Sequence, residues 1–344
     1  SYPPRPKRTI IVDVMADVHV VILAAGKGTR MKSLLPKVLH PVAGVPMIEH
    51  VLGVSGALSP STTTVVVGHM GDRVRGALAA HSHTEFVVQE PQLGTAHALL
   101  QTEPLLCGES GTVVLLSGDV PALRVETLEQ LISTHRNAGA ALTVVTAQVA
   151  EPHGYGRIVR DGGNLARIVE EKDATPDERA ITEINAGIYA FDLEGLFEAV
   201  RSIGAANAQR EYYLPDLVSI YRSAGRVVGT VTVADAAEIQ GINSRAELAS
   251  VGANLRQRRN LELMASGVTI EDPATTYIDA DVQVGADSVI RPGVTLERGT
   301  VVGSGVTIHS GVRVSASTIA DGATVLDHSL ITDSTVGAGA SIGP

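Results

Sequence analysis

Between His19 and about Ile242, short apolar runs alternate with longer amphipathic segments. The apolar runs include VHVVIL, TTTVVV and TVVLL, and one of the amphipathic segments is VETLEQLISTHRNAG. Short β-branched runs indicate buried strands, whereas an apolar residue at every third or fourth position indicates a helix that packs on a sheet. The alternation predicts repeated β-α-β units, a mainly parallel sheet covered by helices, and ligand sites at the carboxyl ends of the strands.

The pattern changes after Tyr277, where an aliphatic residue recurs every six positions and later continues with slips. These positions are Ile278, Val284, Ile290, Leu296, Val302, Ile308, Val314, Ile319, Val325, Ile331, Val336 and Ile342. Helices and ordinary strands have periods of about 3.6 and 2, so a period of six predicts hexapeptide repeats wound into a parallel β-helix. Chance spacing in a tail rich in Val and Gly is the alternative.

With 344 residues, the chain exceeds the usual size of one hydrophobic core, which favours two domains. We expect a first domain over residues 15–242 and a β-helix over residues 267–344. The charged, helical segment 243–266 is predicted to be a linker helix between them. Residues 1–14 are interpreted as a leader or extension and are set aside.

The formal net charge of −10 argues against a nucleic-acid-binding surface, which normally shows a basic excess. Cys107 is the only cysteine, so an internal disulfide and a cysteine-based zinc cluster are excluded. No apolar run approaches the ~20 residues of a membrane span, and no export signal is recognised. These features predict a cytoplasmic protein without a membrane partner.

The first candidate site is LAAGKGTRM, Leu23 to Met31, which directly follows an apolar run. Gly26 and Gly28 let backbone amides approach phosphate oxygens closely, although the spacing is not that of a P-loop. Between Gly26 and Ile48 the chain has no Asp or Glu, but it has four cations: Lys27, Arg30, Lys32 and Lys37. In an acidic chain this local charge predicts a pocket for a triphosphate, and a solvated basic loop is the alternative.

Two further segments supply candidate ligands. The run TVVLLSGDV places Asp119 at the end of a predicted central strand, where a carboxylate can hold a Mg²⁺ that bridges phosphates. In QEPQLGTAHAL, Gln89 and the backbone at Gly94 and Thr95 can read the polar edge of a base. A turn cap at Asp119 and a helix N-cap at Thr95 are the alternatives.

Together, LAAGKGTRM with the following Pro36-Lys37, QLGTAHA and the strand-end GD resemble the sugar-phosphate nucleotidyltransferase (pyrophosphorylase) family. The segments GYGRIV, IVEEKDAT, EINAGIYAF, NAQREYYLPDLV and GINSRAEL more narrowly resemble the bacterial bifunctional N-acetylglucosamine-1-phosphate uridylyltransferase/glucosamine-1-phosphate acetyltransferase family. The resemblance implies an α/β, Rossmann-like nucleotidyltransferase domain followed by a left-handed parallel β-helix. It also implies Mg²⁺-dependent transfer of a uridylyl group from UTP to N-acetylglucosamine 1-phosphate, giving UDP-N-acetylglucosamine and pyrophosphate.

The resemblance also implies roles for the residues that match the family's motifs. Arg30, Lys37 and Asp119 would be catalytic, and Asp119 and Asn243 would bind the metal. The nucleotide would be bound by Leu23, Ala24, Ala25, Gly26, Lys37, Gln89, Gly94, Thr95, Ser117, Gly118 and Asp119. The sugar would be bound by Gly156, Glu170, Asn185 and Asn243. Ser117 and Ala96 depart from the family, which often has Tyr and Gly there, and this bears on substrate preference.

Two other functions stay open: a pyrophosphorylase that makes an ADP-, dTDP- or GDP-sugar, and a catalytically silent scaffold of the same fold. The β-helix is expected to assemble a homotrimer through its flat faces. The family's acetyl transfer from acetyl-CoA is expected only in a longer chain, because the repeats end at Ile342-Gly343-Pro344. His309 and His328 are interpreted as turn or face residues of the repeats.

Overall fold

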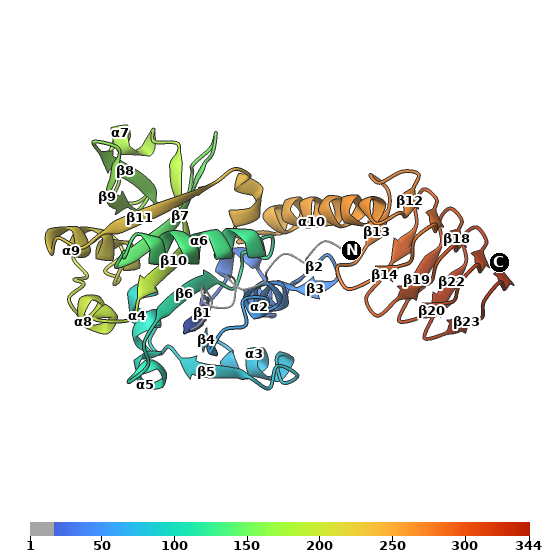
Figure 1. Ribbon diagram of the computed structural model, residues 1–344, viewed down its shortest axis with the longest axis horizontal. Coiled ribbons are helices and arrows are strands. Elements are labelled where there is room, and N and C mark those ends of the chain that lie inside the picture. The colour runs from blue at the N-terminus through green and yellow to red at the C-terminus, as the bar shows by residue number, and fades with distance from the viewer. Residues whose placement is uncertain (1–16) are drawn as a thin grey trace, which may run out of the picture. The chain divides into compact units, whose positions relative to one another are not determined.

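The computed structural model describes residues 17–344, and the predicted leader over residues 1–14 lies outside them. Contacts divide the described chain into two compact units (Figure 1). The first contains the residues up to Leu39 together with Met47–Asn243, and the second contains His40–Pro46 and Ser244–Pro344. The short segment His40–Pro46 therefore groups with the C-terminal residues, although it lies within the predicted first domain over residues 15–242.

The first unit is built on one sheet with the strand order β11-β7-β10-β6-β1-β4-β5, extended at β10 by β8 and β9. The strands are β1 (Val18–Ala24), β4 (Thr62–Val67), β5 (Thr84–Val88), β6 (Thr112–Ser117), β7 (Leu142–Gln148), β8 (Arg157–Asp161), β9 (Asn164–Val169), β10 (Glu183–Asp192) and β11 (Val228–Val233). Strands β1, β4, β5 and β6 pair in parallel, as do β7 and β11. The predicted mainly parallel sheet is confirmed.

Strand β10 pairs antiparallel with β6, β7 and β8, and β8 in turn pairs antiparallel with β9. Its register with β7 shifts between Asn185 and Tyr189, and Gly187 within this irregular stretch has a φ of 71°. A β-bulge re-aims the side chains on either side of it. This detail was not predicted from the run EINAGIYAF.

A helix covers a sheet by packing an apolar stripe against it. In α6, the buried residues Leu128, Leu131, Ile132 and His135 follow the three- and four-residue spacing of such a stripe. Figure 1 shows α6 lying along the strands on one side of the sheet. The helical elements of this unit are η1 (Thr29–Met31), η2 (Lys37–Leu39), α2 (Met47–Gly56), α3 (Gly71–Ala77), α4 (Thr95–Leu100), α5 (Glu103–Leu106), α6 (Val125–Asn137), α7 (Pro176–Arg179), α8 (Leu196–Arg201), η3 (Leu214–Asp216), α9 (Leu217–Ser223) and η4 (Ala236–Ile239).

The second unit combines the pair β2 (Pro41–Val42) and β3 (Val45–Pro46), the helix α10 (Arg245–Ala265) and a run of very short parallel strands. These strands are β12 (Thr269–Ile270), β13 (Tyr277–Ile278), β14 (Gln283–Val284), β15 (Val289–Ile290), β16 (Thr295–Leu296), β17 (Val301–Val302), β18 (Thr307–Ile308), β19 (Arg313–Ser315), β20 (Thr318–Ile319), β21 (Thr324–Val325), β22 (Leu330–Thr332), β23 (Thr335–Val336) and β24 (Ser341–Ile342). Helix α10 is capped by Ser244, whose hydroxyl accepts a hydrogen bond from the Glu247 amide at 3.2 Å.

From β12 onward, every third strand belongs to the same sheet, so the strands form three parallel sheets. Ten of the twelve aliphatic residues at this spacing are buried in one core, whereas Val284 is partly buried and Ile342 is exposed. The predicted β-helix of hexapeptide repeats is confirmed. Among residues 17–344, no helix is long and apolar enough to cross a membrane.

Candidate functional site

A pocket of about 460 Å³ lies at the carboxyl ends of β1 and β6. Strands β1 and β6 pair in parallel with Leu23 opposite Ser117, so the loops that follow them emerge at the same edge of the sheet. Ten of the predicted site residues line the pocket: Leu23, Ala24, Ala25, Gly26, Lys37, Gln89, Gly94, Thr95, Ser117 and Asp119. Segments that are far apart in the sequence therefore form one cavity.

Of the residues predicted to be catalytic or to bind the nucleotide, two lie outside the lining of this pocket. The Gly118 amide donates a hydrogen bond to the Leu23 carbonyl at 2.9 Å, and this bond ties the β1 and β6 loops together. Arg30 is exposed in η1 and does not line the cavity. The structure thus brings Lys37 to the pocket, but it does not bring Arg30.

The loop Gln89–Thr95 is held against the segment Glu211–Leu214. The Tyr212 amide donates to the Leu93 carbonyl at 2.8 Å, and the Ala96 amide donates to the Tyr212 carbonyl at 3.0 Å. The Thr95 hydroxyl accepts a hydrogen bond from the Leu214 amide at 3.1 Å and makes no capping bond to α4. The N-cap alternative for Thr95 is therefore wrong, because Gly94 occupies the cap position.

Gln89 is buried under the same loop. Its Nε2 donates to the Gly94 carbonyl at 2.9 Å and lies 3.2 Å from Nδ1 of His97. These contacts fix the orientation of the side-chain amide at the pocket wall, and an oriented amide can distinguish hydrogen-bond donors from acceptors on a base.

Lys37, Asp119 and Asn243 converge at one end of the pocket. The Lys37 ammonium donates a hydrogen bond to Asp119 Oδ2 and another to Asn243 Oδ1, the latter at 3.0 Å. The Ile242 amide donates to the Asp119 carbonyl at 2.9 Å, which holds the chain before Asn243 against the end of β6. The two predicted metal ligands thus face the same positively charged atom.

This donor set fits a divalent cation such as Mg²⁺. Two protein oxygens already converge on one cation, and Mg²⁺ commonly takes only one or two protein ligands, with water and phosphate oxygens completing its shell. Among residues 17–344, no group of three or more His, Cys, Asp or Glu side chains could hold a metal. A metal at this position would therefore take its remaining ligands from water or from a substrate.

Gly156, Glu170 and Asn185 form a second cluster. A Cβ at Gly156 would lie 3.3 Å from Glu170 Oε1 and 3.5 Å from the Asn185 Cβ, so a side chain at this position would fill the space beside these groups. Asn185 Nδ2 donates to the Tyr189 hydroxyl at 2.7 Å, and the Gly187 amide donates to Asn185 Oδ1 at 2.9 Å. The bulge in β10 thereby fixes the rotamer of Asn185.

The electrostatic environment of this cluster disfavours negative charge. Burial, helped by the neighbouring carboxylates of Asp173, Asp216 and Glu211, raises the pKa of Glu170, and Arg157 opposes the shift. Arg157 is itself almost fully buried and pairs with Glu171 at 2.6 Å. The protonated, uncharged form of the Glu170 carboxyl is therefore favoured more than in water.

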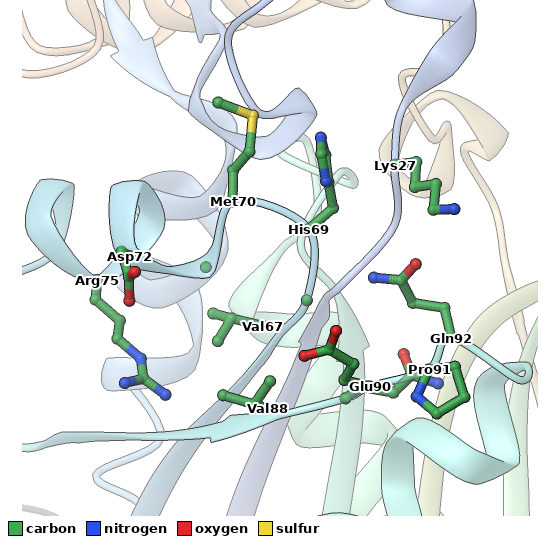
Figure 2. Close-up of a pocket in the computed structure, with 13 residues that line it drawn as sticks. Lys27, Val67, His69, Met70, Asp72, Arg75, Val88, Glu90, Pro91 and Gln92 are labelled. Atoms are coloured by element: carbon green, nitrogen blue, oxygen red, sulfur yellow. The ribbon is translucent and has the colours of Figure 1, made fainter.

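A second pocket, of about 650 Å³, adjoins the first and shares Lys27, Gln89 and Gln92 with it. Figure 2 shows Lys27 and Gln92 on one side of this pocket and Asp72 and Arg75 of α3 on the other. Lys27 was predicted as one of the four cations of a triphosphate pocket, whereas Gln92 was not predicted, although it lies within QEPQLGTAHAL. Glu211 also lines the first pocket. It lies in NAQREYYLPDLV, where no sequence pattern marked it as a site residue.

Residues 20–182 match the family model of the MobA-like NTP transferase domain. Residues 270–344 match the model of the GMPPB C-terminal domain. The first match spans the β1 loop, the Gln89–Thr95 loop and Asp119, and the second spans the hexapeptide repeats.

Curated relatives include proteins described as bifunctional protein GlmU. The one from Syntrophotalea carbinolica is 52% identical over 81% of this chain, and the one from Geobacter metallireducens is 50% identical over 82%. The chain spans 60% of the length of each of these two relatives. The chain is also similar to a solved structure from Bacillus anthracis that is described provisionally as a glucose-1-phosphate thymidylyltransferase. The match covers 69% of this chain and 94% of the other chain, with a TM-score of 0.55 and 21% identity. This last likeness supports the fold.

Proposed function

Because the chain belongs to the family of the bifunctional GlmU proteins, we propose that it transfers the uridylyl group of UTP to N-acetylglucosamine 1-phosphate. The products are UDP-N-acetylglucosamine and pyrophosphate, and the metal is Mg²⁺. The observation that carries the proposal is the convergence of Lys37, Asp119 and Asn243 beside the pocket formed by the nucleotide loop.

In this reaction a phosphate oxygen of the sugar phosphate bonds to the α-phosphorus of UTP, and the bond from that phosphorus to the α,β-bridging oxygen breaks. The nucleophile is already anionic near neutral pH, so no side chain has to remove a proton. The protein must instead align the two substrates and offset their negative charge. Mg²⁺ held by Asp119 and Asn243 would stabilise charge on the phosphate oxygens when bound.

The other residues have separate tasks in this proposal. Lys37 neutralises phosphate charge from the pocket wall, and Arg30 can do so only from its exposed position in η1. Gln89 and the backbone at Gly94 select the base, while Glu170 and Asn185 bond sugar hydroxyl and amide groups. The support for this division is that the Gln89 amide and the Asn185 amide are each held in one orientation by hydrogen bonds.

The direct test is release of pyrophosphate measured across a grid of nucleoside triphosphates and sugar 1-phosphates. We expect the highest rate with UTP and N-acetylglucosamine 1-phosphate, loss of activity with a chelator and recovery on adding Mg²⁺. A higher rate with ATP, dTTP or GTP would favour another pyrophosphorylase. Pyrophosphate release at background with every pair would support the silent scaffold and overturn the proposal.

The β-helix is proposed to assemble a homotrimer, since three flat faces of parallel strands suit a closed ring of identical copies. The support is that β12 to β24 form three separate sheets. Light scattering of the full chain is the test, and a stable monomer at working concentration would contradict the assembly.

A further inference from the structure

Lys37 occupies the place that the divalent metal needs. Its ammonium donates to Asp119 Oδ2 and to Asn243 Oδ1, which are the two oxygens assigned to the metal. A metal ion that bonds these oxygens at about 2.1 Å would lie next to the ammonium and be repelled by it. The lysine and the metal therefore compete for one pair of oxygens.

This competition is little screened by solvent. The Lys37 side chain is 13% exposed and that of Asp119 is 18% exposed, so both charges lie mostly out of water. Electrostatic interactions between partly buried charges are screened less than those at an open surface. Displacing the ammonium thus requires another group that attracts it.

The backbone and Cβ of Lys37 are held by their neighbours, so only the outer part of its side chain is free to move. Val38 is buried in the core of the first unit, and Gly28 packs so closely on Lys37 that an added Cβ would lie 2.7 Å from the Lys37 Cβ. Lys37 also lines the nucleotide pocket, together with Lys27. The ammonium can turn toward the phosphates of a bound nucleotide while its backbone stays in place.

We propose that Lys37 excludes the divalent metal from Asp119 and Asn243 in the free protein and releases these ligands when nucleotide phosphates draw its ammonium away. Lys37 thereby makes metal binding conditional on the nucleotide. When the Lys37 ammonium moves to the nucleotide phosphates, the same movement frees the oxygens of Asp119 and Asn243 for the metal. The inference rests on the proposed function in that it takes Asp119 and Asn243 as the metal ligands.

The test measures binding of Mn²⁺ alone to the full chain, with free Mn²⁺ followed by electron paramagnetic resonance and with no nucleotide or sugar present. Lys37→Met is expected to bind Mn²⁺ about tenfold more tightly than the unaltered protein. Lys27→Met is the matched control, because it removes one positive charge from the same pocket wall without removing the donor to Asp119 and Asn243. Adding Asp119→Asn to Lys37→Met is expected to abolish the gain.

Equal gains in Lys27→Met and Lys37→Met would show a diffuse charge effect and overturn the proposal, as would no gain in Lys37→Met. Lys37→Gln, which keeps a hydrogen-bond donor, is the second variant if Lys37→Met does not fold, and the same two outcomes apply to it. The Mn²⁺ assay measures binding and does not depend on turnover. Failure of the pyrophosphate-release test would therefore reject the proposed function, whereas the Mn²⁺ result would test the role of Lys37 separately.

Discussion

The backbone of Tyr212 lies directly against Gly94, so that a Cβ added at Gly94 would come within 2.6 Å of the Tyr212 carbonyl oxygen and 2.8 Å of its amide nitrogen. Gly94 also has a φ of 107°, which residues with a side chain rarely adopt. The contact joins the Gln89–Thr95 loop to a segment more than a hundred residues later in the chain. The shape of the pocket wall thus depends on one missing methyl group.

Gly94→Ala is expected to lower the free energy of unfolding by about 1–3 kcal/mol and to weaken nucleotide binding strongly, since it combines backbone strain with a steric clash. Urea denaturation and nucleotide titration measure the two effects. Gly76→Ala is the control, because a Cβ at that position in α3 meets nothing within 4 Å. It is expected to be neutral or slightly stabilising. Equal behaviour of the two variants would contradict the role of the Tyr212 contact.

Much of this site could be predicted because its residues stand directly after strong strand signals. The apolar runs of β1 and β6 predict parallel neighbours, and Gly26 and Asp119 follow them at the same sheet edge. The hexapeptide period likewise predicts the β-helix core, since no helix or ordinary strand shares that period.

The remaining features depend on contacts that local patterns do not encode. The bulge at Gly187 arises from pairing of β10 with β7, and Tyr212 reaches Gly94 only after the sheet has formed. The grouping of His40–Pro46 with the second unit has no counterpart in the hydrophobic pattern. The exposed position of Arg30 was also not predicted, because the sequence of the basic span gives the charges of its side chains but not the directions in which they point.

Asp119→Ala is expected to lower turnover by about 10²–10³-fold with the fold retained, because its carboxylate contacts a cation at the pocket and does not belong to the core. Circular dichroism checks the fold and pyrophosphate release measures turnover. Asp161→Ala, at an exposed end of β8, is expected to keep full activity. Substantial Mg²⁺-dependent turnover by Asp119→Ala would reject the metal assignment.

Lys37→Ala is expected to lower turnover by about 10²-fold or more, whereas Lys32→Ala changes it little. Both lysines lie in the basic span, but Lys32 is exposed and only Lys37 lines the pocket. Steady-state rates at saturating substrate compare them. Equal losses would indicate a diffuse field of positive charge in place of a specific contact.

His135 is expected to make the protein less stable in mild acid. Burial lowers the pKa of this histidine from 6.5 to about 4, against an opposing effect of Asp192. As the pH falls from 6.5 toward 4, the unfolded chain takes up a proton that the folded chain does not, so the free energy of unfolding falls. The loss attributable to this group is on the order of 2–3 kcal/mol.

The measurement is urea denaturation at about pH 7 and about pH 4.5 for the unaltered protein and for His135→Gln, which removes the titrating group. Gln can still contact Thr143, whose hydroxyl lies 3.1 Å from His135 Nδ1. The variant is expected to lose less stability between the two pH values. An identical loss in both proteins would mean that His135 is protonated in the folded state as readily as in the unfolded one.

Tyr189→Phe is expected to raise the KM for the sugar 1-phosphate by about tenfold, with little change in the KM for UTP. The Tyr189 hydroxyl accepts the hydrogen bond from Asn185 Nδ2 at 2.7 Å, and without it the Asn185 amide can rotate away from Glu170 and from the proposed position of the sugar. Stability is expected to fall by about 1 kcal/mol, because a buried donor loses its partner.

The control is Tyr221→Phe, since among the described residues the buried Tyr221 hydroxyl has no hydrogen-bond partner. That variant is expected to be neutral or stabilising and to leave both KM values unchanged. If Tyr189→Phe raises the KM for UTP as much as that for the sugar phosphate, then Asn185 supports the whole pocket and does not specify the sugar.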